Sequence, residues 1–275
     1  MQDFFEDGIL DGRAALVTGG GTGLGLEIAR LLARLGAKVA IASRDPQHHH
    51  DFLADAEREG WRARAEVCDV REPDTVREVV EAVAADFGGL DVLVNNAAGN
   101  FIRPALALPP KGWRAVIDIA LSGVFYCSQA AARVMRLQEG GGSIVNIIAP
   151  YAWTGAPGVV HSVSAKAGVL AMSKSLAVEW ARYKIRVNCV APGPFDTEGA
   201  ASRLWPTPEM RAEIEAGVPL GRFASTEEVA RATVYLATPQ AAYITGATLT
   251  VDGGFSLGKG LGGELDPESV PRRRG

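Results

Sequence analysis

The feature that most constrains the fold is a glycine-rich turn near the start of the chain. An apolar run at residues 13–18 leads directly into Thr18-Gly19-Gly20-Gly21-Thr22-Gly23-Leu24-Gly25. Apolar residues then recur at helical spacing and end at a glycine (Ile28, Leu31, Leu32, Leu35, Gly36). This order predicts a strand, a tight turn and a helix, with a backbone that can approach a pyrophosphate at the helix amino end. A turn that only joined a strand to a helix would not need so many glycines.

The rest of the chain alternates between strand-like and helix-like segments. Strand patterns lie at 39–42, 63–68, 90–94, 143–149, 186–190 and 248–251, and helical patterns lie at 73–87, about 112–137, 164–183 and 225–237. This alternation predicts the α/β class, with a Rossmann-type, doubly wound, parallel sheet of about seven strands and helices on both faces. We expect residues 1–275 to form a single domain, with a substrate loop at 195–223 and a loosely ordered tail at 258–275.

The residues that follow the strands indicate which nucleotide the turn binds. An acidic residue after the second strand would bind a ribose 2′-hydroxyl, whereas Ser43 and Arg44 suit a 2′-phosphate. Asp45 comes one position later and leaves NAD open. Asp69 follows the third strand, where it can reach the adenine amine, and the small residues at 96–98 leave room for a flat ring. The sequence therefore favours NADP(H).

An uncharged stretch precedes a single lysine in the middle of the chain. Residues 140–165 contain no Asp, Glu, Lys or Arg, and Lys166 follows them near the start of a helix. The helix dipole disfavours a cation there. Lys166 either lays its stem on apolar surface with its head in water, or is held beside a cofactor and the phenol of Tyr151. The stretch could span a bilayer by length, but its glycines, Pro150 and Pro157 break any helix.

Composition excludes several functional classes. The net charge of −4 gives no support for nucleic-acid binding, and 47% hydrophobic residues suit a domain with a full core. Cys68, Cys127 and Cys189 lie far apart in apolar runs, which predicts reduced core residues. The histidines at 48–50 predict a solvated helix start, and we expect no metal. The acidic segment 1–7 differs from basic targeting signals, so we expect a soluble, cytoplasmic protein that binds no membrane.

These motifs resemble the short-chain dehydrogenase/reductase family over about residues 10–255. The matching pieces are Thr18–Gly25, Asp69, Asn95–Gly99, Lys166 and Pro192-Gly193. Three of the four usual catalytic residues are absent. Ser162 stands four residues before Lys166, where the family places a tyrosine; Ala149 replaces a serine, and Ala120 replaces an asparagine.

Within that family the pattern is most similar to the mitochondrial-type 2,4-dienoyl-CoA reductases. It shares the Asn-Asn-Ala-Ala-Gly-Asn-Phe-Ile run at 95–102, a tyrosine fifteen residues before the lysine, the Ser-x-Ser-Ala-Lys run at 162–166 and the loop at 197–204. The resemblance implies NADPH-dependent reduction of 2,4-dienoyl-CoA to 3-enoyl-CoA in unsaturated fatty acid degradation. Two alternatives stay open: reduction of another enoyl thioester, enone or ketone, and NADPH binding without catalysis.

The resemblance also implies the catalytic residues. Tyr151 and Asn100 would hold the thioester oxygen, and Ser162 would orient the groups around them. Lys166 would bind the nicotinamide ribose and lower the pKa of the Tyr151 phenol by its charge. His161 is expected to be a loop residue and not a base.

Further residues would bind the cofactor and the substrate. Phe101, Tyr151 and Arg203 would contact the acyl-CoA. The expected cofactor-binding residues are Gly19, Gly21, Thr22, Gly23, Leu24, Gly25, Ser43, Arg44, Asp69, Val70, Asn96, Ala97, Ala98, Lys166, Pro192, Gly193, Phe195 and Thr197.

Two helical segments carry apolar residues on more than one face. These residues are Val116, Phe125, Val169 and Trp180. Because one side of a domain cannot bury them all, we expect a symmetric oligomer, and the resemblance implies a homotetramer.

Overall fold

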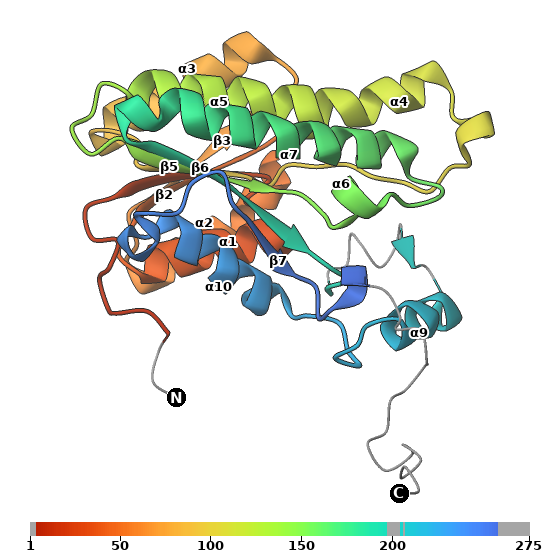
Figure 1. The fold of residues 1–275 in the computed structure, drawn as a ribbon. Helices are drawn as coiled ribbons and strands as arrows, with labels where there is room; N and C mark the ends of the chain where they lie inside the picture. Colours follow the sequence, from red (N-terminus) through yellow and green to blue (C-terminus); the bar gives the residue numbers. More distant parts are fainter. Residues whose placement is uncertain (1–3, 197–203, 206, 258–275) are drawn as a thin grey trace, which may run out of the picture.

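Seven parallel strands form the centre of the computed structural model, which describes residues 4–196, 204–205 and 207–257 (Figure 1). The strands are β1 (Ala14–Thr18), β2 (Lys38–Ser43), β3 (Ala63–Val67), β4 (Val92–Asn95), β5 (Gly142–Ile147), β6 (Ile185–Pro192) and β7 (Thr248–Val251). Their order in the sheet is β3-β2-β1-β4-β5-β6-β7, and every neighbouring pair is parallel. The predicted doubly wound, Rossmann-type sheet is confirmed.

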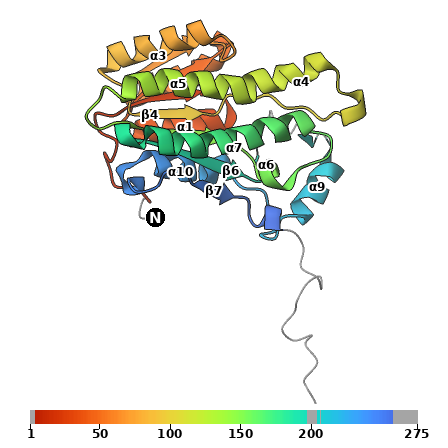
Figure 2. The ribbon, with the colours of Figure 1, turned by 45° about the horizontal axis from the view of Figure 1, so that its top comes forward.

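Helices cover both faces of this sheet (Figures 1 and 2). One face carries α1 (Gly23–Arg34), α2 (His50–Glu59) and α10 (Thr226–Ala237), and the other carries α3 (Pro73–Phe87), α5 (Gly123–Met135) and α7 (Val160–Trp180). Three shorter helices are α4 (Pro110–Ile117), α6 (Tyr151–Thr154) and α9 (Pro208–Ala216). A hydrophobic core lies on each side of the sheet, so strands and helices bury their apolar faces against one another.

The structure corrects two of the predicted elements. The single helix at 112–137 is α4 followed by a π-helical turn at Asp118–Ser122 and then α5. The predicted loop at 195–223 contains α9, which Thr207 caps by accepting a hydrogen bond from the Met210 amide at 3.3 Å. Because none of the α9 residues is buried, the segment lacks the apolar stripe by which a helix is recognised. Residues 197–203 and the tail at 258–275 lie outside the described residues.

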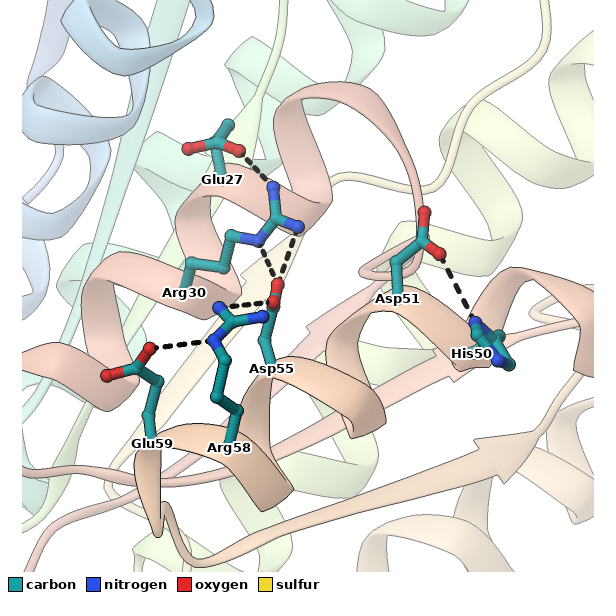
Figure 3. Close-up of polar contacts among 7 residues, drawn as sticks. All are labelled: Glu27, Arg30, His50, Asp51, Asp55, Arg58 and Glu59. Carbon is teal, nitrogen blue, oxygen red and sulfur yellow. Dashed lines mark hydrogen bonds and ion pairs between the residues drawn. The ribbon is translucent and has the colours of Figure 1, made fainter.

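A network of ion pairs fastens α2 to α1 beside the glycine-rich turn (Figure 3). Arg30 of α1 donates to Asp55 of α2 at 2.6 Å and to Glu27 at 2.6 Å. Arg58 also pairs with Asp55, at 2.7 Å, and with Glu59, at 3.0 Å. Burial raises the pKa of Asp55, but the hydrogen bonds from both arginines outweigh it and hold that pKa below its usual value. The carboxylate therefore stays ionised and holds α2 against α1.

Within the described residues, one helical span is long and apolar enough to cross a membrane by length and composition alone. This span, Pro110–Met135, comprises α4, the π turn and α5, and half of its most apolar window is buried inside the protein. Core helices of globular proteins pass the same test, so the span is weak evidence for a membrane segment.

Candidate active site

A cleft of about 1380 Å³ opens at the carboxyl ends of β1, β2, β3 and β4. In this sheet order the chain winds in opposite directions from β1 and β4, and ligands bind at such switch points. The predicted cofactor residues that line the cleft are Gly19, Thr22, Gly23, Leu24, Gly25, Ser43, Arg44, Asp69, Val70, Asn96, Ala97, Ala98 and Phe195. Gly21, Lys166, Pro192 and Gly193 are not among its lining residues, and Thr197 lies outside the described residues.

The amino end of α1 faces this cleft without a cap. Thr22, at the cap position, makes no side-chain hydrogen bond to the helix, and the first turn carries no acidic residue. The first amide N–H groups of a helix have no partner within it, and the positive end of the helix dipole lies there. Both features suit a pyrophosphate, so the residues present fit a dinucleotide.

Two glycines of the turn are required by close packing. A Cβ on Gly25 would lie 2.0 Å from the Gly19 carbonyl oxygen, and a Cβ on Gly21 would lie 2.0 Å from the His48 carbonyl oxygen. Gly21 therefore fits the turn against the β2–α2 connection, which explains why it does not line the cleft.

Thr18, at the end of β1, ties the turn to the end of β4. Its hydroxyl oxygen accepts hydrogen bonds from the amides of Asn96 and Ala97, each at 3.1 Å. The Asn96 side chain donates in return to the carbonyls of Thr18 at 3.2 Å and Gly19 at 3.1 Å. Thr18 thus holds two walls of the cleft together, a role that the sequence pattern alone did not reveal.

The residues after β2 leave a basic side chain on the rim of the cleft. Arg44 is exposed there, and the Ser43 hydroxyl donates to the Asp45 carbonyl oxygen at 3.0 Å. The Asp45 carboxylate caps a short 3₁₀ turn by accepting from the Gln47 amide at 2.9 Å. Asp45 therefore has a structural use that is separate from binding a ribose.

Asp69 meets a partner that sequence reasoning missed. Its carboxylate accepts hydrogen bonds from Arg71, which lies two residues further on, at 2.9 and 3.0 Å. These bonds hold the pKa of Asp69 below its usual value against the opposing effect of burial. Asp69 lines the cleft as predicted, but its side chain is already bonded to an arginine.

Two of the four predicted catalytic residues form a close pair. The Tyr151 hydroxyl lies 2.9 Å from the Ser162 Oγ, which joins α6 to the first turn of α7. Lys166, one turn further along α7, is buried and donates from Nζ to the Ile147 carbonyl oxygen at 2.7 Å. The Asn100 Oδ1 accepts from the Phe101 amide at 2.9 Å. No hydrogen bond within the described residues joins Tyr151 to Lys166 or to Asn100.

Burial is the largest influence on the pKa values of Tyr151 and Lys166. It raises the pKa of Tyr151, and the hydrogen bond with Ser162 only partly offsets this effect. It also lowers the pKa of Lys166 to about 8. The prediction that Lys166 lowers the phenol pKa is therefore wrong for this structure, because burial and the Ser162 hydrogen bond shift the pKa of Tyr151 and the lysine charge has no part in it. The alternative with the lysine head in water is also wrong, since the ammonium is enclosed.

We expect activity to decline as the pH rises through about 8. Lys166 loses its proton near that value, whereas Tyr151, with its raised pKa, stays neutral. If the ammonium holds the cofactor ribose, kcat/KM measured from pH 6.5 to 9.5 should fall on the alkaline side. Lys166→Arg keeps a charge over this range and should remove the inflection, even at lower activity. A wild-type profile that is flat to pH 9.5 would contradict the assigned role.

The structure corrects the place of His161. It lies in the first turn of α7 and not in a loop, and its side chain is fully buried. Ala149 and Ala120 are buried as well, and neither supplies a polar side chain at its family position. Of the histidines at 48–50, predicted to be solvated, His49 is buried. Arg203 lies outside the described residues.

The parallel sheet, the glycine-rich turn and the uncapped helix at the switch point define a dinucleotide-binding domain of the Rossmann type. A family model described as Enoyl-(Acyl carrier protein) reductase matches residues 19–256. The chain belongs to the short-chain dehydrogenase/reductase family and is an oxidoreductase of that family.

Several similar proteins carry a more specific name. A probable 2,4-dienoyl-CoA reductase of Bacillus subtilis, described as (2E)-enoyl-CoA-producing, is 42% identical over 250 residues, which cover 89% of this chain and 97% of the relative. A peroxisomal 2,4-dienoyl-CoA reductase of Arabidopsis thaliana, described as (3E)-enoyl-CoA-producing, is 38% identical over 267 residues, covering 94% and 89%. The crystal structure of a gluconate 5-dehydrogenase from Burkholderia cenocepacia, in complex with NADP and tartrate, has a TM-score of 0.85 at 35% identity, covering 90% and 96%.

Proposed function

We propose that this oxidoreductase reduces 2,4-dienoyl-CoA to 3-enoyl-CoA with NADPH, in the cytoplasm, as a step of unsaturated fatty acid degradation. The observation that carries the proposal is the hydroxyl pair of Tyr151 and Ser162, at 2.9 Å, one turn before the buried Lys166. A tyrosine in this displaced position suits a substrate whose oxygen is distant from the carbon that is reduced. The relatives named as 2,4-dienoyl-CoA reductases support the proposed substrate, and the Arabidopsis thaliana relative, described as (3E)-enoyl-CoA-producing, also supports the proposed product.

The geometry of the substrate explains why the donor is displaced. In a simple ketone the reduced carbon bears the oxygen, so the acid stands beside the nicotinamide. In a 2,4-dienoyl thioester the reduced carbon is C5, while negative charge accumulates on the carbonyl oxygen several bonds away. The hydrogen-bond donors must therefore lie beside the carbonyl oxygen, because catalysis stabilises negative charge where it develops.

Each residue of the site has one role in the proposed reaction. NADPH, when bound, supplies the hydride that reaches C5. Tyr151 and Asn100 donate hydrogen bonds to the thioester oxygen, and Ser162 holds the Tyr151 hydroxyl in place. Lys166 binds the nicotinamide ribose. Protonation at C2 by water then completes the 3-enoyl-CoA.

The proposal is tested by NADPH oxidation with three substrates in parallel. Activity on 2,4-hexadienoyl-CoA without activity on crotonyl-CoA or acetoacetyl-CoA is the expected result. Crotonyl-CoA or acetoacetyl-CoA as the preferred substrate would replace the proposal by reduction of another thioester or ketone. NADPH binding without turnover of any of the three would indicate a non-catalytic protein. NMR of the product distinguishes the 3-enoyl-CoA proposed here from the 2-enoyl-CoA named for the Bacillus relative.

NADPH is expected to bind at least about tenfold more tightly than NADH, a difference of about 1.4 kcal/mol. The exposed Arg44 on the rim of the cleft, next to Ser43, suits a 2′-phosphate. Arg44→Ala should remove most of the preference and leave NADH affinity nearly unchanged, as measured by fluorescence titration of both cofactors. Equal affinities in the unmutated protein would refute the 2′-phosphate assignment.

We further propose that the protein is a homotetramer, although three of the four apolar residues expected at subunit interfaces are buried within one chain. Val116, Val169 and Trp180 are buried within the single chain, so they need no partner subunit. Phe125 of α5 remains exposed, and so does Val178 of α7. Light scattering at micromolar concentration should give a mass near four chains. A mass near one chain would rule the assembly out.

A further inference from the structure

His161 is a buried polar side chain that no proposed step uses. It is fully buried in the first turn of α7, directly before Ser162. Neither of its ring nitrogens has a hydrogen-bond partner among the described residues. Buried polar groups in native proteins are almost always paired, because an unpaired one destabilises the fold. An unpaired imidazole beside a catalytic cluster therefore requires an explanation.

An aromatic contact connects His161 to the predicted substrate site. The ring of Phe101 meets the imidazole edge to face, with centroids 4.5 Å apart and an interplanar angle of 66°. Phe101 is half-buried and packs in turn against the cluster of Val116, Ala120 and Ala165. None of these side chains offers a hydrogen bond to the imidazole.

The imidazole is held in its neutral form. Burial lowers the pKa of His161, although the Val159 carbonyl acts in the opposite direction. A neutral imidazole has one N–H donor and one acceptor nitrogen. It can therefore donate one hydrogen bond to an uncharged or developing anionic oxygen without carrying a charge of its own.

We propose that His161 donates a hydrogen bond to the carbonyl oxygen of the bound acyl thioester, and that the Phe101 ring turns aside to admit it. The inference rests on the proposed function. A dienoyl chain is a hydrocarbon, and the thioester carbonyl is its hydrogen-bond acceptor. His161 lies in the same turn of α7 as Ser162, which bonds Tyr151, and it contacts Phe101, the residue after Asn100. His161 is thus a third donor at the oxygen that Tyr151 and Asn100 hold.

The first test observes the imidazole directly. The chain has four histidines, so ¹⁵N-histidine labelling gives few ring signals, and those of His161 are identified by their loss in His161→Phe. Hexanoyl-CoA, a saturated thioester that cannot be reduced, is added in the presence of NADP⁺. The ring-nitrogen signals of His161 should shift, while those of the exposed His50 on α2 should not. Unmoved His161 signals at concentrations where hexanoyl-CoA inhibits the enzyme would overturn the proposal.

The second test separates a functional from a structural role. His161→Phe keeps an aromatic ring against Phe101 and removes both nitrogens, so kcat/KM for 2,4-hexadienoyl-CoA should fall about tenfold or more while the melting temperature stays equal or rises. His161→Gln restores an N–H donor and should recover part of the activity. His50→Phe is the matched control and should match the wild type.

The outcomes also distinguish this inference from the proposed function. An active wild type with an equally active His161→Phe would overturn the role of His161 alone. A wild type that turns over no dienoyl-CoA would overturn the proposed function, and the inference with it.

Discussion

Tyr151→Phe is expected to lower kcat on 2,4-hexadienoyl-CoA by roughly 10²–10³-fold, the usual effect of losing one donor to a developing oxyanion. The change removes the hydroxyl that lies 2.9 Å from the Ser162 Oγ and keeps the ring in place. NADPH affinity should hardly change, because the hydroxyl acts mainly on the transition state. The loss of one hydrogen bond should reduce stability by no more than about 1 kcal/mol. Steady-state kinetics, a fluorescence titration with NADPH and thermal unfolding measure the three effects.

Companion variants determine whether the donor is displaced as proposed. Asn100→Ala should lose activity comparably, and the double variant should be less than additive if both residues serve one oxygen. Ser162→Ala should have a smaller effect, because Ser162 only positions the phenol. The opposite pattern, with Tyr151→Phe almost fully active and Ser162→Ala inactive, would return the chemistry to the usual family position and refute the displaced-tyrosine mechanism.

The fold could be predicted largely because its signals are local. Helix α3 was predicted with both ends correct, since Pro73 stands at its first position and Gly88, with φ +82°, terminates it. Five of the seven predicted strands (β1, β2, β4, β5 and β6) are mostly buried, as in a parallel sheet covered on both faces. The edge strands β3 and β7 have no buried residue, but the alternation of segments along the chain still located them. The π turn at Asp118–Ser122 was not predicted, because its sequence continues the apolar pattern of the helices on either side. Helix α9 was missed because it buries no face.

The site was less predictable, because it depends on contacts between distant segments. The positions of Tyr151, Ser162 and Lys166 could be read from the sequence, but the sign of the pKa change at Tyr151 could not. That sign depends on how completely the tertiary structure removes water from the phenol. The bond of Lys166 to the Ile147 carbonyl and the contact of His161 with Phe101 likewise exist only once α7 packs against its neighbours.

The arrangement of the cluster agrees with the absence of the usual family residues. Ala149 and Ala120 are buried and supply no polar side chain at the two family positions that they occupy. The Tyr151 hydroxyl, which α6 supplies, instead lies within hydrogen-bond distance of Ser162. Ser162 is the residue that stands where the family places its tyrosine. Under the proposed function, the substituted alanines and the displaced tyrosine would be two parts of one change in where the substrate oxygen is held.

Gly25→Ala is expected to weaken NADPH binding by roughly 10²-fold, because the turn cannot keep its shape with one more carbon. The added Cβ would lie 2.0 Å from the Gly19 carbonyl oxygen and 2.5 Å from the Asn96 side-chain nitrogen. Both neighbours are fixed: Asn96 donates to the Gly19 carbonyl at 3.1 Å, and Gly19 has a φ of +63° that most other residues cannot adopt. Overpacking of this kind costs about 1–3 kcal/mol. Where the free turn relaxes and the bound turn must return to its native shape, this cost opposes binding, and at its upper end it corresponds to about a hundredfold change in affinity.

Gly140→Ala provides the matched control for this variant. Gly140 is exposed, its φ is not positive, and the nearest atom to an added Cβ is 3.6 Å away on the flexible side chain of Arg13. NADPH affinity, measured by fluorescence titration, should be unchanged in this control, and the melting temperature without cofactor should change little. If Gly25→Ala bound NADPH as tightly as the control, the pyrophosphate would not rest on this turn. If both variants lost affinity equally, the loss would come from a general effect of the added methyl group and not from the contact between Gly25 and Gly19.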